Sequence, residues 1–103
     1  MKLLYIMLDE FFAVAEFLEG NYSVADDKII INSNVFYKLL DKNLYIKRKE
    51  KLDFYRSMNL IICNSNGYTS VIYDKETKKA KRKIIFNYGL YKTLKKLSDI
   101  NFY

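Results

Sequence analysis

The densest group of chemically similar side chains lies between positions 75 and 83, where six of nine residues are basic and only Glu76 is acidic. The basic residues are Lys75, Lys78, Lys79, Lys81, Arg82 and Lys83. Ammonium and guanidinium groups attract phosphates whatever the sequence, and Arg82 could also pair with guanine or enter a narrow minor groove. We therefore expect this segment to contact nucleic acid. The alternative is that a lysine-rich sheet edge only prevents aggregation between strands.

A second basic set lies in the segment 47–59 and consists of Arg48, Lys49, Lys51 and Arg56. As a helix, this segment would expose its basic residues to solvent and bury Leu52, Tyr55 and Met58. The alternative is an ordinary solvated helix face on which Glu50 and Asp53 form local ion pairs. Because these two acids offset two of the positive charges, we expect segment 75–83 to dominate binding to a polyanion.

Residues with catalytic or metal-binding chemistry are scarce. The sequence has no His and one cysteine, Cys63, with neither a glycine-rich phosphate loop nor a clearly spaced carboxylate pair. Asp26 and Asp27 could bind a cation weakly, but adjacent acids in a turn are usually just solvated. The ten tyrosines could stack on single-stranded bases, yet most fall where core residues are expected. We expect a protein that is not an enzyme and that needs no metal or cofactor.

Charge is distributed unevenly along this 103-residue chain of net charge +6. Residues 1–35 contribute 2 − 6 = −4 and residues 36–103 contribute 16 − 6 = +10, which predicts one side that faces a polyanion and another that faces something else. The apolar run from Leu3 to Leu8 is followed by acids, unlike a signal peptide, and no run is long enough to span a membrane. With a lone cysteine, these features predict a cytoplasmic protein.

Hydrophobic spacing and turn residues predict the elements of the fold. We expect a helix over 9–19, a strand over 28–31, helices over 34–41 and 47–59, a hairpin with strands 68–74 and 79–86, and a helix from 90 to near the C-terminus. Residues 1–8 fit either an extension of the first helix or a strand. Asp9 is expected to cap the first helix and Asn32 or Ser33 the second, with Asn59 in a left-handed conformation after the third. The hairpin residues expected to face the core are Val71, Tyr73, Ile84 and Phe86, which splits its basic residues between two faces.

This order of elements resembles the winged helix-turn-helix family over residues 9–87. The stretch from Ile29 to Ile62 corresponds to the strand, helix, turn and helix of that family. Met58-Asn59-Leu60-Ile61 resembles the Gly-Leu-Ile ending at which the family's third helix enters its wing, and the hairpin 68–86 matches the wing. The resemblance implies a single α+β domain over 1–103 with a three-helix core, a β-hairpin wing and an additional C-terminal helix.

Among winged-helix proteins, the chain is similar in size, element order, lysine-rich wing and Lys/Asn/Ile/Tyr-rich composition to the TcpK-type accessory proteins of clostridial conjugative plasmids. This similarity implies a homodimer that binds double-stranded DNA at a transfer origin, together with other relaxosome proteins. The wing contacts that it implies are Lys78, Lys79, Lys81 and Arg82. Two alternatives stay open, namely a winged-helix transcriptional regulator and a mobile-element interaction module or inhibitor whose basic face meets an acidic protein or RNA.

The first predicted helix independently indicates a homodimer. Too many of its residues are apolar for all of them to face one sheet, namely Phe11, Phe12, Val14, Phe17 and Leu18. Its acids Glu16 and Glu19 would keep it away from DNA and leave it free to pair subunits.

Overall fold

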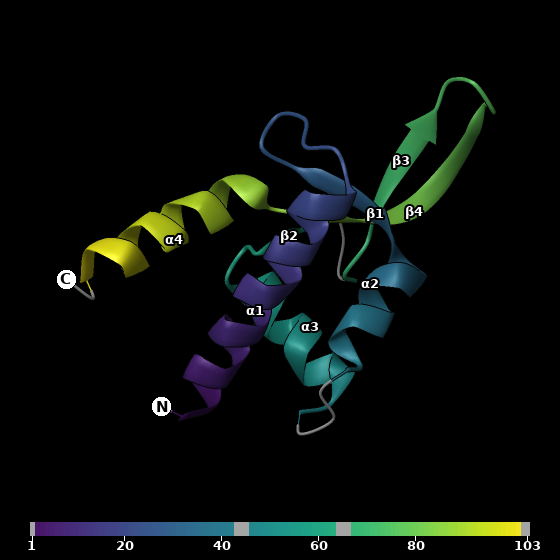
Figure 1. The fold of residues 1–103 in the computed structure, drawn as a ribbon. Helices are drawn as coiled ribbons and strands as arrows, with labels where there is room; N and C mark the ends of the chain where they lie inside the picture. The colour runs from purple at the N-terminus through teal and green to yellow at the C-terminus, as the bar shows by residue number, and fades with distance from the viewer. Residues whose placement is uncertain (1, 43–45, 64–66, 102–103) are drawn as a thin grey trace.

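The computed structural model describes residues 2–42, 46–63 and 67–101, and within them the chain forms four helices and four strands (Figure 1). In chain order these are α1 (Lys2–Asn21), β1 (Ile29–Asn32), α2 (Ser33–Leu40), α3 (Arg48–Ser57), β2 (Ile61–Ile62), β3 (Ser70–Asp74), β4 (Lys79–Phe86) and α4 (Tyr88–Asn101). The expected α+β class, the order of the helices and the hairpin with its four-residue loop are confirmed. The short strand β2 was not expected from the sequence.

Helix α1 is twenty residues long and begins at Lys2, so the first residues extend the helix and do not form a strand. Asp9 therefore lies inside the helix, and its expected role as an N-cap is wrong. In the described part of the chain, no helix is long and apolar enough to cross a membrane.

The four strands form one antiparallel sheet in which β4 pairs with each of the others. Both β1 and β2 pair with Ile85 and Phe86, and both β1 and β3 pair with Lys83. Since a strand has two edges, β1 follows one edge of β4, while β2 and β3 follow the other edge one after the other. The long strand β4 therefore holds the whole sheet together.

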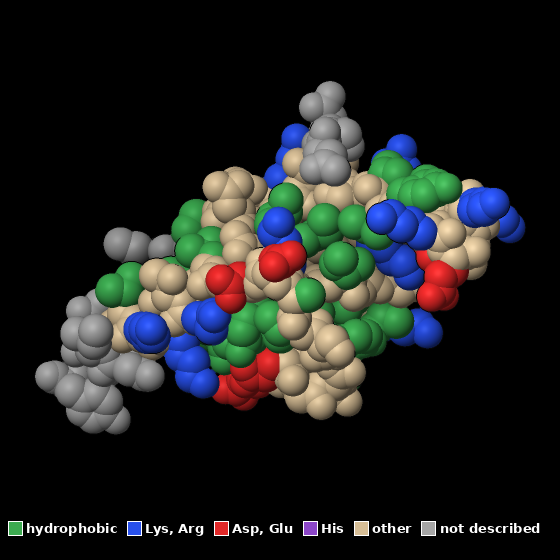
Figure 2. Space-filling model, turned by 90° about the horizontal axis from the view of Figure 1, so that it is seen from above, with side chains coloured by type: hydrophobic (Ala, Val, Ile, Leu, Met, Phe, Trp, Pro, Cys, Tyr) green, Lys and Arg blue, Asp and Glu red, His purple; other side chains and the backbone are tan. Residues whose placement is uncertain are grey.

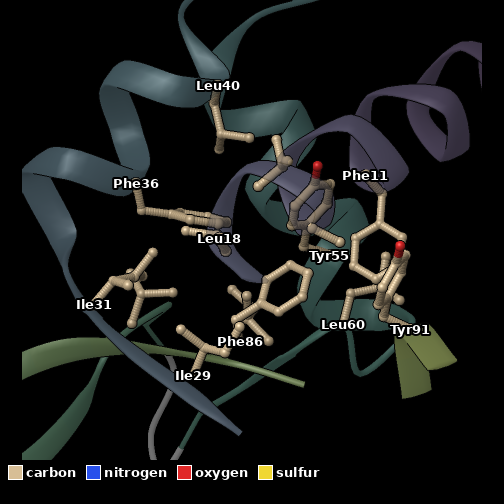
Figure 3. Packing of buried hydrophobic residues seen from close by; sticks show 14 of the residues in the cluster. Phe11, Leu18, Ile29, Ile31, Phe36, Leu40, Tyr55, Leu60, Phe86 and Tyr91 are labelled. Carbon is tan, nitrogen blue, oxygen red and sulfur yellow. The ribbon is translucent and has the colours of Figure 1, made fainter. Parts of the chain in front are cut away.

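The helices cover one face of this sheet and bury a single aromatic-rich core. The sheet contributes the fully buried side chains Ile29, Ile31, Ile61, Ile84 and Phe86. From α1, the ring of Phe11 stacks 5.2 Å from that of Phe86 and meets the ring of Tyr55 edge-on at 5.7 Å (Figure 3). Tyr91 of α4 also packs against Phe11, so the cluster joins all four helices to the sheet.

Two local predictions at element ends are confirmed. The side chain of Asn32 accepts a hydrogen bond from the backbone N–H of Asn34 at 2.9 Å and so caps α2. Asn59 has a φ of 59° directly after α3, the left-handed conformation that asparagine tolerates better than most residues. Both signals depend only on neighbouring residues, which is why the sequence reveals them.

Three predicted burial assignments are wrong. Met58 was expected in the core but is 46% exposed, because α3 ends at Ser57 and Met58 follows its last turn. Val71 and Tyr73 were also expected in the core, yet they are 51% and 60% exposed. They lie on the same sheet face as Ile84, but beyond the part of the sheet that the helices cover.

Helix α3 offers a test of its register. Leu52→Ala should lower the free energy of unfolding by about 2–4 kcal/mol, because it leaves a cavity among well-packed side chains. Met58→Ala is the matched control and should change stability by less than about 0.5 kcal/mol, since Met58 is exposed. Urea denaturation followed by circular dichroism measures both, and equal losses would contradict the register of α3.

Candidate nucleic-acid interface

The distal half of the β3–β4 hairpin extends away from the body of the protein (Figure 1). Along β4, the residues from Lys79 to Arg82 are exposed, whereas Ile84, Ile85 and Phe86 are buried. The change occurs where β1 stops pairing with β4, at Lys83. One end of β4 is therefore buried in the core. The other end pairs with β3 to form a two-stranded arm that projects into solvent.

Strand register divides the arm into two different faces. Residues directly opposite each other in an antiparallel pair share a face, and β3 pairs Val71 with Arg82 and Tyr73 with Ala80. We call these four residues the Arg82 face. The opposite face, here called the lysine face, contains the intervening pairs, which join Lys79 to Asp74, Lys81 to Ile72 and Lys83 to Ser70. The predicted split of basic residues between two sides of the hairpin is confirmed.

The positive charges of the arm are poorly compensated. Residues 70–86 contain six basic side chains against Asp74 and Glu76, which leaves 6 − 2 = +4. Within the described residues, none of these six cations forms an ion pair with a carboxylate. The carboxylate of Asp74 instead accepts a hydrogen bond from the backbone N–H of Glu76 at 2.9 Å, which lowers the pKa of Asp74 below its ordinary value. The lysines therefore remain available to an external anion.

Lys78, at the end of the loop, adopts an unusual backbone conformation. Its φ is 56°, in the left-handed region where glycine is favoured and where a Cβ is sterically disfavoured. Asp26, Asp27 and Asn59 also have positive φ, and all four residues lie in turns. A lysine at this position adds one more charge at the tip of the arm.

Three of the four residues in the second predicted basic set, on α3, form ion pairs with carboxylates of the chain. Arg48 Nε donates to Asp41 Oδ1 at 2.9 Å, and its guanidinium lies 5.0 Å from the centre of the Tyr37 ring. This hydrogen bond lowers the pKa of Asp41, so the pair stays ionised. Lys49 is exposed but lies 3.3 Å from Asp53, and Arg56 is half-buried.

The prediction that Lys51 faces solvent is wrong, because this residue is only 1% exposed. It lies four residues before Tyr55 and next to Leu52, on the face of α3 that packs inward. Its Nζ is 2.9 Å from Glu10 Oε2 of α1 and also donates to the backbone carbonyl of Leu40 in α2. Lys51 thus ties three helices together and cannot contact a ligand on the surface.

Asp53 further reduces the positive charge on the exposed side of α3. Its carboxylate accepts a hydrogen bond from the hydroxyl of Tyr68, which lowers the pKa of Asp53 and raises that of Tyr68. Asp53 therefore remains negative near Lys49. Of the two predicted basic sets, only the hairpin presents an uncompensated group of charges.

At two other candidate sites, carboxylates already have partners within the chain. Lys92 of α4 binds Asp27 at 2.8 Å, so the weak cation site suggested for Asp26 and Asp27 already has a lysine at one carboxylate. The shallow cleft lined by Lys92, Lys95 and Lys96 also contains Glu19, which accepts a hydrogen bond from Tyr88 at 2.8 Å. Among the residues that the structure describes, no cluster of three or more His, Cys, Asp or Glu side chains could hold a metal ion.

Comparison with known proteins adds no family assignment, since no protein-family model and no curated protein matches the chain. The geometry and charge of the hairpin, and the arrangement of the helices behind it, are the features from which a function can be inferred.

The buried ion pair between Lys51 and Glu10 can be tested by its removal. Lys51→Met should lower the free energy of unfolding by about 3–5 kcal/mol, because it leaves the mostly buried Glu10 without its cation. The double variant Lys51→Met/Glu10→Leu should recover at least half of that loss, since it removes both charges. Lys49→Met is the control at an exposed position and should change stability by less than about 0.5 kcal/mol. A double variant less stable than Lys51→Met in urea denaturation would contradict this account.

Proposed function

We propose that this protein binds double-stranded DNA as a winged helix-turn-helix protein, with the β3–β4 hairpin as its principal contact. The observation that carries the proposal is the hairpin itself, a projecting arm with six basic residues and no ion pair to any of them among the described residues. A narrow arm with charge on both faces can follow a groove of DNA while its lysines reach phosphates on either side. A solubilising sheet edge requires fewer charges than this.

The chain topology supports a winged helix. After α1, the strand β1 leads into the paired helices α2 and α3, and the chain then returns through β2 and β3 to the long strand β4. The resulting strand order places β4 between β1 and the β2–β3 edge. In such a protein α3 would be the recognition helix, but its basic residues are paired or partly buried, which favours the hairpin as the dominant contact.

The biological setting that we propose is the transfer origin of a conjugative plasmid, where the protein would act as a relaxosome accessory factor. A transcriptional regulator with the same fold would use the same DNA contacts and differ only in its target. Gel-shift assays with duplexes from the transfer origin and from the neighbouring promoter separate the two. Selective binding of the promoter would favour the regulator, and capture of a protein or RNA without any duplex binding would favour an interaction module.

We also propose that the protein is a homodimer that pairs through α1. Phe17 is 41% exposed and lines a groove of about 440 Å³ with Ile6, Ala13 and Leu39. This groove runs between α1 and α2, and its lining also includes the charged residues Asp9, Glu10 and Lys42. An apolar stripe on a helix that already buries Phe11 and Leu18 on its other side is typical of a subunit interface.

The dimer is tested by sedimentation equilibrium at micromolar concentration. The wild-type protein should have about twice the 12.3-kDa chain mass, and Phe17→Glu should shift it to the monomer mass by placing a charge in the interface. Ile30→Glu is the matched control, because Ile30 is an exposed apolar residue outside the groove. A wild-type protein that sediments only as the monomer would refute the dimer.

The salt dependence of DNA affinity tests the role of the hairpin. If each subunit of a dimer neutralises about four phosphates, the logarithm of the binding constant should fall against log salt with a slope near −7. Lys79→Ala/Lys81→Ala should flatten this slope by about 2–4 and weaken all DNA sequences alike. Lys95→Ala/Lys96→Ala removes the same charge from α4 and should leave the slope nearly unchanged. If Arg48→Ala/Lys49→Ala abolishes specific binding while the hairpin variants bind normally, α3 is the dominant contact instead.

A further inference from the structure

Helix α4 leaves the body of the protein after its first turns. Its N-terminal half packs on α1, where Tyr91 contacts Phe11, and its C-terminal half extends away from the other helices and strands (Figure 1). Leu90, Leu94 and Leu97 recur at helical spacing and so form one stripe along α4. Leu90 and Leu94 are partly buried against the core, whereas Leu97 is 48% exposed. The leucine stripe therefore continues past the part of the body that covers it.

We propose that the leucine stripe of α4 docks in the groove between α1 and α2 of a second copy of the chain, and that the two copies exchange their α4 helices reciprocally. An amphipathic helix binds an apolar groove through side chains at i, i+4 and i+7, which is the spacing of the three leucines. Reciprocal exchange closes the pair about a two-fold axis, because each copy gives one helix and receives one. The inference rests on the proposed homodimer and deepens it by naming the two surfaces that meet.

The groove has the apolar lining that such a helix requires. Its volume is about 440 Å³, and its apolar residues are Ile6, Ala13, Val14, Phe17 and Leu39. Ile6 and Phe17 are 44% and 41% exposed, so a docked helix would remove two large apolar side chains from water. Ala13 is exposed between them, and its small side chain leaves room for a leucine of the incoming helix.

Charge favours this pairing over contact between two α1 helices. Helix α1 has one lysine and four acids, which gives 1 − 4 = −3, and α4 has three lysines and one acid, which gives 3 − 1 = +2. The groove lining includes Asp9, which forms no ion pair within the described residues. Lys95 and Lys96 are exposed and lie on opposite flanks of the leucine stripe. Two α1 helices would instead bring acids against acids, which disfavours association.

The α4 helix of the same chain does not reach this groove. Tyr91 packs on Phe11, and Tyr88 donates a hydrogen bond to Glu19 at 2.8 Å, so the base of α4 is fixed on α1. Figure 1 shows α4 and α2 on opposite sides of α1, and the groove lies on the α2 side. In Figure 2, Lys or Arg side chains lie beside hydrophobic ones at the α4 end of the molecule, opposite the hairpin. A second copy must therefore supply the helix that fills the groove.

Sedimentation equilibrium of two variants and of their mixture tests the exchange. Leu97→Glu places a charge in the leucine stripe and Phe17→Glu places one in the groove, so each variant alone should sediment near the 12.3-kDa chain mass. An equimolar mixture should recover a species of about twice that mass. In the mixture, the intact helix of the Phe17→Glu chain meets the intact groove of the Leu97→Glu chain. Recovery would also show that both variants are folded.

Val71→Glu is the matched control, because Val71 is a comparably exposed apolar residue of the hairpin, outside both α4 and the groove. It should sediment like the wild type. If Leu97→Glu stays dimeric, or if the mixture stays monomeric, α4 does not dock in the groove and the inference is overturned while the homodimer can still stand. A wild-type protein that is monomeric would refute the homodimer and the inference together. Failure to bind DNA in gel-shift assays would refute the DNA-binding function alone.

Discussion

The antiparallel pairing of β4 with every other strand is the constraint on which the rest of the structure depends. Its last three residues, Ile84 to Phe86, are buried and pair with β1, and Ile85 and Phe86 pair with β2 as well. Its N-terminal half pairs only with β3 and projects into solvent. The same strand therefore forms part of the core and part of the projecting arm. The arm is anchored at its base, where the ring of Phe86 stacks on that of Phe11.

The buried ion pair between Lys51 and Glu10 is the second organising contact. It links α3 to α1, and the hydrogen bond from Lys51 to the carbonyl of Leu40 adds α2. An ion pair removed from water contributes little net stability, yet the loss of either partner is severe. The pair therefore connects the three helices and leaves one positive charge fewer on the exposed side of α3. The basic residues of α3 thus form ion pairs within the chain. The hairpin carries the basic residues that have no such partner among the described residues.

The two ends of the molecule differ in charge and in exposed chemistry. Helix α1 presents acids and the apolar groove around Phe17, and the hairpin presents lysines and the Arg82 face. A polyanion would be repelled from the first and attracted to the second. This separation allows subunit pairing and DNA binding to occupy different surfaces of one small domain, as the proposed function requires.

The features that depend on near neighbours can be predicted from the sequence alone. Residues a few positions apart predict the helices, the Asn32 cap, the left-handed Asn59 and the hairpin from β3 to β4. They also predict that Lys79 and Arg82 lie on different faces of the hairpin. Which of the predicted faces are buried depends on long-range packing, because a face is covered only where another helix or strand lies over it. Lys51 is buried since Glu10, forty-one positions earlier in the chain, meets it. Tyr73 is exposed because the helices do not reach the end of the hairpin. The alternation of residues along a strand does not show how far the helices extend over the sheet.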